Sequence, residues 1–262
     1  MNLRSNLKRP IVFIPLTIVG LFLFWLLLSL YLANQAGQLI FLPERSYNII
    51  PPIGYQQEFF STPSGEDIDA WYFPKENSEN AILFLHGNSG RPPHFFPDLT
   101  QQASVYAPSY PRFGLSSNKD LSQETVFETA EGALKQLKEK GYQPENITVM
   151  GHSFGGAPAV YLASQNDDLG KLIVINSFSS VYSMCVRSYF FLCEFGRDIF
   201  PSSTYAKEVT IPTEIYHYPN DSTIPFAEGQ KLFEAVGSED KTFIELSGYS
   251  HAAIPFGEIF GE

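Results

Sequence analysis

The sequence predicts an α/β fold with a mostly parallel central sheet and helices on both faces. Three observations support this class. Short apolar runs typical of buried strands recur along the chain, a helical pattern separates two of them, and one run ends in the order Gly-x-Ser-x-Gly. The length of 262 residues suits one such domain, and 44% hydrophobic residues provide enough apolar surface for a full core.

The expected elements follow one another in an alternating order. Residues 55–62 and 68–73 predict two strands of a hairpin, because the turn-forming stretch 63–67 separates them. Residues 122–140 predict a helix, since Ser122 is a good N-cap and Gly141 follows the last turn. Further strands are expected at 81–85, 103–107, 147–150, 171–175, 213–218 and 242–246, and a final helix at 254–260.

An apolar segment at residues 11–32 precedes the domain. This uncharged run of 22 residues is long enough to span a bilayer, so we expect an uncleaved transmembrane signal anchor. Basic residues at 4, 8 and 9 precede it, and the next one is Arg45. The positive-inside rule then predicts a cytoplasmic N-terminus at 1–10 and a periplasmic or other extracytoplasmic domain at 55–262. Prolines and glycine within 33–54 predict a linker between them.

Composition narrows the classes of function. The formal net charge of −11 argues against a nucleic-acid partner, because such proteins need a basic surface. The histidines and cysteines lack zinc-site spacing, so no metal and no cofactor is expected. Cys185 and Cys193 form either a disulfide or two separate thiols.

Residues 151–155, Gly-His-Ser-Phe-Gly, are typical of a nucleophile elbow. In such an elbow a tight turn from a strand into a helix presents the hydroxyl of Ser153, and the flanking glycines let the turn close. A glycine-rich turn without chemistry is the alternative. The backbone N–H of Phe154 is one expected donor to an oxyanion, and that of Asn88, in the His-Gly loop after strand 81–85, is the other.

A serine nucleophile needs a base, and the base needs an acid that fixes its tautomer. Asp221 lies in a turn after strand 213–218, whereas Glu214 and Glu245 fall inside predicted strands. His251 is the histidine that follows Asp221 in the chain, and it lies on a glycine-bearing loop. We expect the His152 side chain to point away from the hydroxyl. His94 and His217 are interpreted as structural or surface residues.

Four stretches together resemble the α/β-hydrolase superfamily. They are Leu-His-Gly-Asn at 85–88, the elbow at 151–155, Asp-Ser-Thr-Ile-Pro at 221–225, and Gly-Tyr-Ser-His at 248–251. With the N-terminal segment, the chain resembles single-pass membrane-anchored α/β-hydrolase-domain proteins, which include lipid and S-acyl-protein hydrolases. The resemblance runs from about Tyr55 to the C-terminus and implies an α/β-hydrolase fold with catalytic Ser153, Asp221 and His251. Residues 110–116 depart from it, because Pro111 and Arg112 replace the Arg-Gly that often stands there.

The predicted function is that of a serine hydrolase that cleaves carboxylic esters or thioesters through an acyl-enzyme on Ser153. The membrane segment and a small cap favour a lipid-like or acylated substrate. Alternatives are a peptidase, amidase or acyltransferase of the same fold, or a non-catalytic scaffold. An aromatic cluster forms either a small lid or part of the core; it comprises Tyr189, Phe190, Phe191 and Phe195.

Overall fold

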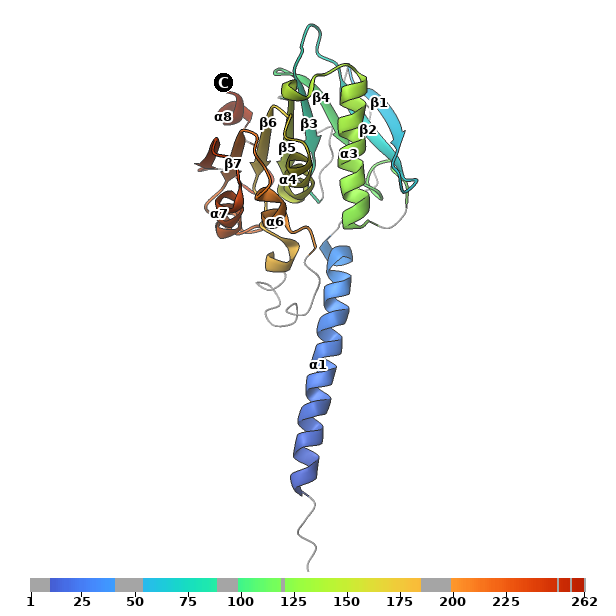
Figure 1. The fold of residues 1–262 in the computed structure, drawn as a ribbon, viewed down its shortest axis with the longest axis vertical. Helices are drawn as coiled ribbons and strands as arrows, with labels where there is room; N and C mark the ends of the chain where they lie inside the picture. The colour runs from blue at the N-terminus through green and yellow to red at the C-terminus, as the bar shows by residue number, and fades with distance from the viewer. Residues whose placement is uncertain are drawn as a thin grey trace, which may run out of the picture.

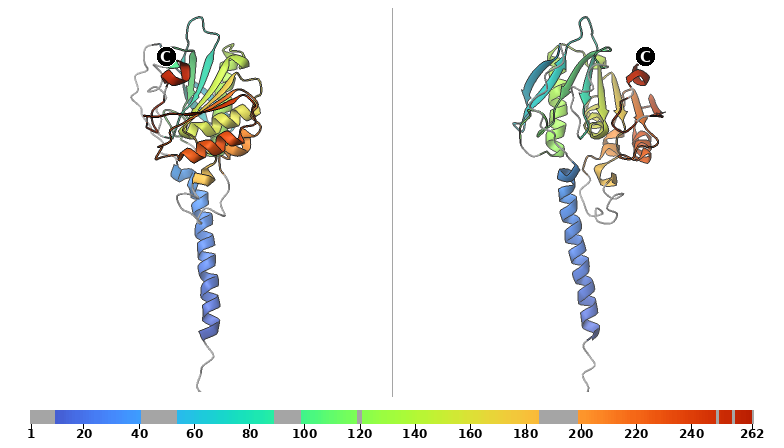
Figure 2. Two further views of the ribbon diagram at one scale, coloured as in Figure 1. Left: turned by 90° about the vertical axis from the view of Figure 1, so that its left-hand side faces the viewer. Right: turned by 180° about the vertical axis from the view of Figure 1, so that it is seen from behind.

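One mixed sheet organises the domain. The computed structural model describes residues 10–40, 54–88, 99–118, 121–184, 199–248, 250–254 and 256–261. Eight strands within these residues pair in the order β1-β2-β4-β3-β5-β6-β7-β8 (Figures 1 and 2). The strands are β1 (Gln56–Ser61), β2 (Asp67–Phe73), β3 (Ala81–Leu85), β4 (Ser104–Pro108), β5 (Ile147–His152), β6 (Lys171–Ile175), β7 (Thr213–His217) and β8 (Lys241–Glu245).

The sheet is mostly parallel, as the sequence predicts. β1 pairs antiparallel with β2, and β2 with β4, which confirms the expected hairpin. Every other neighbouring pair is parallel. The carboxyl ends of β3, β5, β6, β7 and β8 therefore meet at one edge of the sheet, which is where ligands and catalytic groups gather in open α/β folds.

Helices cover both faces of this sheet in the described residues. They are α3 (Gln123–Glu139), α4 (Gly156–Gln165), α6 (Ser202–Ala206), α7 (Phe226–Ala235) and α8 (Phe256–Phe260), with short 3-10 turns η2 (Pro144–Asn146) and η3 (Ser153–Gly155). The central strand β3 shows how alternation builds two cores. Leu83 and Leu85 pack with apolar residues of α3, α4, α6 and α7, whereas Ile82 and Phe84 face the side that α8 covers.

The sequence also predicts why α3 begins and ends where it does. Ser122 is the N-cap: its Oγ accepts a hydrogen bond from the Thr125 N–H at 3.2 Å, and Thr125 Oγ1 accepts one from the Ser122 N–H. Gly141 follows the helix with a φ of 96°, a conformation that favours glycine. α3 links β4 to β5, which makes the strand-helix-strand unit that leads to Ser153.

Helix α1 (Pro10–Ile40) precedes the sheet in the chain, and Figure 1 shows it as one long rod. Its side chains are described for residues 16–31, and many of the large apolar ones are exposed. No helix in the described part of the chain is both long enough and apolar enough to cross a membrane. Residues 33–40, which we expected in the linker, continue the helix, and no proline occurs between residue 33 and Pro43. The expected linker residues 41–53 lie outside the described residues.

The loop at 110–116, where the sequence departs from the superfamily pattern, keeps a glycine-like backbone. Arg112 has a φ of 72° and Gly114 a φ of 52°. The Arg112 N–H donates to Ser117 O at 2.8 Å, and the Leu115 N–H donates to the buried Asp69 carboxylate at 3.0 Å. These contacts hold Arg112 in a left-handed conformation that costs a non-glycine residue about 1 kcal/mol.

We expect shortening a leucine side chain in the buried strand β3 to destabilise the domain far more than the same substitution in an exposed loop. Leu83→Ala removes a fully buried side chain and should lower the free energy of unfolding by about 2–5 kcal/mol. The matched control is Leu115→Ala, because Leu115 is 43% exposed, and it should cost less than about 1 kcal/mol. Urea unfolding followed by circular dichroism measures both values. Equal losses would contradict the assignment of β3 to the core.

Candidate active site

The elbow follows β5 directly. β5 ends at His152, η3 begins at Ser153, and α4 starts at Gly156. Ser153 has a φ of 54°, a left-handed conformation that is uncommon for a non-glycine residue and is held by the surrounding packing. Its side chain is nearly buried, with 8% of the residue exposed.

Two glycines make this turn sterically feasible. A Cβ on Gly151 would overlap the backbone of Gly155, and one on Gly155 would overlap the carbonyl group of Leu85 at the end of β3. These contacts are with backbone atoms, which cannot move aside without distorting the sheet. These close backbone contacts therefore explain why small residues are required two positions before and after Ser153, as the sequence predicts.

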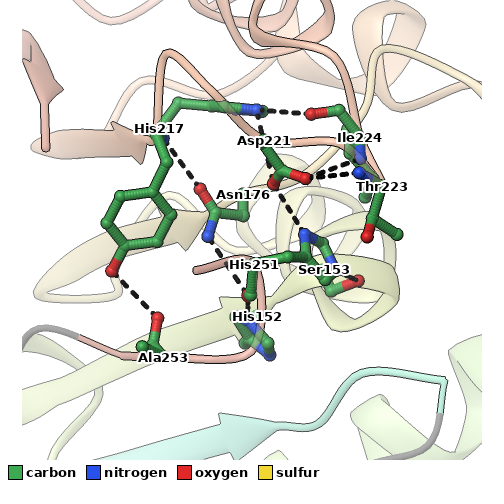
Figure 3. A network of polar contacts seen from close by, with 10 residues as sticks. His152, Ser153, Asn176, His217, Asp221, Thr223, Ile224, His251 and Ala253 are labelled. Carbon is green, nitrogen blue, oxygen red and sulfur yellow. Dashed lines mark hydrogen bonds and ion pairs between the residues drawn. The ribbon is translucent and has the colours of Figure 1, made fainter. Parts of the chain in front are cut away.

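Three side chains from different strand ends form a hydrogen-bonded chain (Figure 3). Ser153 Oγ lies 2.9 Å from His251 Nε2, and His251 Nδ1 lies 2.6 Å from Asp221 Oδ2. The carboxylate accepts the Nδ1–H, which leaves Nε2 as the acceptor for the serine hydroxyl. The structure thus brings together Ser153, Asp221 and His251, the three residues that sequence reasoning selected.

Asp221 is fixed by its own turn. Its Oδ1 accepts hydrogen bonds from the N–H groups of Thr223 at 2.7 Å and Ile224 at 2.9 Å, while its side chain is fully buried. Burial by itself raises the pKa of Asp221. The hydrogen bonds from His251 and the Ile224 and Thr223 amides outweigh burial, so the pKa lies below its ordinary value and the carboxylate is ionised at neutral pH.

The loop after β3 lies against the elbow. A Cβ on Gly87 would lie only 3.2 Å from Ser153 Cβ. The His86 Nδ1–H donates to Gly87 O at 2.6 Å, so the carbonyl of the Gly87–Asn88 peptide points toward the His86 ring. A trans peptide directs its N–H opposite to its carbonyl, so the Asn88 N–H points away from that ring. Phe154, the other expected donor, is buried beside Ser153, with its ring against Tyr110 and Phe200.

Asn176 was not anticipated at the site, nor were the contacts that His152 and His217 make there. Asn176, directly after β6, and His152 both donate to the carbonyl oxygen of His251, at 3.3 and 2.9 Å. His152 therefore points toward the loop that carries His251, the base loop. His217 is fully buried and donates to Ile224 O at 3.0 Å. The available signal for Asn176 was a polar residue at the carboxyl end of a buried strand.

Other predicted residues lie outside the described part of the chain. They are His94, Cys185, Cys193 and the aromatic residues Tyr189, Phe190, Phe191 and Phe195. The disulfide and lid alternatives therefore stay predictions.

The geometry suits acyl transfer. A buried hydroxyl contacts one imidazole nitrogen, and the other nitrogen of that ring donates to an ionised, immobilised carboxylate. Such an arrangement lets the imidazole accept a proton when the hydroxyl oxygen attacks an electrophile, because the adjacent carboxylate stabilises the resulting cation.

Comparison with known proteins agrees with the fold. Residues 82–252 match the model of the alpha/beta hydrolase family. The match covers more than half of the chain and includes the loop after β3, the elbow, Asp221 and His251. The protein therefore belongs to the alpha/beta hydrolase family.

Particular relatives are distant. The chain is 26% identical over 167 residues to human alpha/beta hydrolase domain-containing protein 17B, a match that covers 60% of this chain and 56% of the relative. It is 30% identical to alpha/beta hydrolase domain-containing protein aho-3 of Caenorhabditis elegans, over 62% of this chain and 49% of that one. The chain thus spans about half the length of these curated relatives.

Solved structures share the fold. The esterase Pf2001 of Pyrococcus furiosus superposes with a TM-score of 0.66 at 16% identity, covering 84% of this chain and 93% of that one. Identity at this level supports the common architecture alone.

Two buried histidines near the site predict a specific loss of stability in acid. Burial lowers the pKa of both His86 and His152 from 6.5 to about 4. The unfolded chain binds their protons first, so their contribution is complete above pH 6.5 and is lost as the pH falls toward 4. Each histidine should cost about 1.4 kcal/mol per pH unit within that window.

Urea unfolding of the wild type and of His152→Gln, at pH values from about 7.5 to about 4.5, measures this effect. Glutamine does not titrate and keeps an N–H donor, so the free energy of unfolding of the variant should fall less steeply with decreasing pH. Parallel curves for the two proteins would contradict the assignment of His152 as a buried neutral ring.

Proposed function

We propose that the protein is a serine hydrolase that cleaves carboxylic ester or thioester bonds through an acyl-enzyme on Ser153. The observation that carries the proposal is the continuous hydrogen-bonded chain from Ser153 Oγ through His251 to Asp221. Membership of the alpha/beta hydrolase family and the fold shared with an esterase support the same reaction class.

In this mechanism Ser153 Oγ attacks the acyl carbonyl carbon while His251 Nε2 takes the hydroxyl proton. The tetrahedral intermediate collapses, His251 gives that proton to the departing alcohol or thiol, and the acyl group stays on Oγ. His251 then takes a proton from water, whose oxygen attacks the acyl-enzyme, and the acid leaves as Ser153 regains its proton. Asp221 keeps His251 in the required tautomer and stabilises the imidazolium formed in each step.

The oxyanion is assigned to the backbone N–H groups of Asn88 and Phe154. The hydrogen bond from His86 Nδ1 to Gly87 O supports this role for Asn88, because it fixes the orientation of the Gly87–Asn88 peptide that carries the N–H. Phe154 lies in η3, directly before α4, where the partial positive charge at the start of that helix also favours an anion. Removing one such donor typically costs about two to three orders of magnitude in turnover.

We further propose that residues 11–32 anchor the protein in a membrane and that the substrate is lipid-like or acylated. The continuous uncharged run supports the anchor. Exposed apolar side chains on the described part of α1 also support it; they include Leu16, Leu21, Phe24 and Leu27. The charge asymmetry supports a cytoplasmic N-terminus and an extracytoplasmic hydrolase domain.

Ser153→Ala should abolish covalent labelling by a fluorophosphonate probe and lower ester turnover by about four orders of magnitude or more, because the variant lacks the nucleophile. Ser164→Ala is the matched control, since this serine hydroxyl donates to Tyr161 O within α4 and accepts from the Gln165 side chain, and it should label normally. Asp221→Asn should label slowly, because it stabilises the wrong histidine tautomer. A folded wild-type protein that neither labels nor hydrolyses any ester would favour a non-catalytic scaffold.

A panel of p-nitrophenyl esters from short to long acyl chains, together with lipid esters and an S-acylated peptide, tests the substrate class. We expect kcat/KM to rise with chain length. Turnover confined to short, water-soluble esters would contradict a lipid-like substrate and leave the reaction class intact.

Two charges in the apolar segment should release the protein from membranes. Leu21→Arg combined with Phe24→Arg adds about 2.5–3.5 kcal/mol per arginine to the cost of insertion at the centre of a span. Leu115→Arg, in an exposed loop of the domain, is the matched control and should stay membrane-bound after alkaline carbonate extraction. A C-terminal alkaline phosphatase fusion, active only outside the cytoplasm, reports the orientation. Extraction of the wild type by carbonate would contradict the anchor.

A further inference from the structure

The base of the site lies on a weakly supported loop. His251 follows β8, and β8 is an edge strand that pairs with β7 in the described sheet. Ser247, Gly248, Ser250 and Ala252 are exposed, so the described residues of this loop bury few side chains of their own. The His251 ring nevertheless has to meet two partners at hydrogen-bond distance, and its position must come from contacts with the rest of the domain.

Two side chains hold the carbonyl group of His251. The His152 Nε2–H donates to His251 O at 2.9 Å, and the Asn176 Nδ2–H donates to the same oxygen at 3.3 Å (Figure 3). One carbonyl oxygen has two lone pairs, so both bonds form together. His152 ends β5 and Asn176 follows β6, so the donors come from two central strands of the sheet.

The orientation of the Asn176 amide is itself determined. Its Oδ1 accepts a hydrogen bond from the Tyr218 N–H at 3.0 Å, so its Nδ2 is the atom that faces His251 O. Asn176 is fully buried and has a φ of 49°, a left-handed conformation that asparagine tolerates better than most residues. The residue thus joins the end of β7, just before the turn that holds Asp221, to the base loop.

A third donor holds the loop two residues further on. The hydroxyl of Tyr218 donates to Ala253 O at 2.9 Å, and Tyr218 is almost completely buried. The carbonyl groups of His251 and Ala253 are therefore both fixed by side chains at the ends of the buried strands β5, β6 and β7.

We propose that His152, Asn176 and Tyr218 are positioning residues, together a base clamp, that hold the backbone of residues 251–253 so that the His251 ring reaches both Ser153 and Asp221. The inference rests on the proposed function, because it assigns a task within that reaction. The clamp acts through the backbone of His251, whereas Ser153, His251 and Asp221 carry the chemistry. A displacement of about 1 Å in a catalytic group can cost a factor of about 100 in rate, so small losses of alignment are measurable.

The cleanest test removes one hydroxyl. Tyr218→Phe in the full-length chain, purified in detergent, should lower kcat by about threefold to tenfold and leave KM unchanged, because one hydrogen bond to the base loop is lost. Tyr161→Phe is the matched control: it removes a hydroxyl that donates to the Glu131 carboxylate of α3 at 2.6 Å. A loss in Tyr218→Phe no greater than that in Tyr161→Phe, or a change confined to KM, would overturn the proposal.

A second pair of variants tests the donor on His152. His152→Gln keeps an N–H donor and should retain at least about a third of kcat, whereas His152→Leu has a similar volume without a donor and should lose about tenfold or more. Thermal unfolding of both variants reports whether the fold is equally intact. Equal activity in the two variants would show that donation to His251 O is not needed.

A spectroscopic readout separates this inference from the proposed reaction. The His251 Nδ1–H that Asp221 accepts should give a far-downfield proton resonance in the wild type, and it does not require turnover. We expect that resonance to broaden or move upfield in Tyr218→Phe and His152→Leu but not in Tyr161→Phe. If the resonance changed in these variants but the wild-type protein was not labelled by the fluorophosphonate probe, the proposed function would be refuted and the clamp supported. Unchanged resonances in all variants would refute the clamp alone.

Discussion

Gly155 approaches the end of β3 so closely that any side chain there would overlap the carbonyl group of Leu85. This backbone contact joins the elbow to the neighbouring strand and sets the distance between Ser153 and the His86-Gly87 loop. The left-handed conformation of Ser153 depends on the same contact, because the turn cannot open without moving β3. Ser153 and the proposed oxyanion donors therefore occupy one rigid unit in the middle of the sheet.

Parallel strand pairing brings Asn176, Asp221 and His251 close to Ser153. Because β5, β6, β7 and β8 run in one direction, the residues that follow them lie side by side although they are far apart in the sequence. Ser153 follows β5, Asn176 follows β6, Asp221 lies in the turn after β7, and His251 lies on the loop after β8. Each strand provides one member of a single hydrogen-bond network, which explains why a fold of this class can carry such a site on its loops.

Continuous apolar runs made much of the fold predictable. β3 and β6 have the expected boundaries, because each is an uninterrupted buried strand bounded by polar residues or turn formers. Ser153, Asp221 and His251 were selected from motif and chain order, and the structure places them within hydrogen-bond distance. Asn176 and Tyr218 were not selected, because their partners are backbone carbonyls of a loop about 35 to 75 residues away in sequence, brought near only by the sheet. The end of α1 was missed because the expected boundary was placed at the end of the apolar run, whereas the helix continues to Ile40.

The position of His251 at the rim has a consequence for heating. Ser153 follows the central strand β5, whereas the proposed base, His251, follows the edge strand β8. Edge strands and their loops unfold locally at a lower free energy than the core of a domain. The proposed hydrolase activity should therefore be lost at a lower temperature than the bulk secondary structure. It should return on cooling as long as the core has not unfolded. The highest temperature at which this protein is active is therefore set by the stability of its edge strand and loop rather than by that of its core.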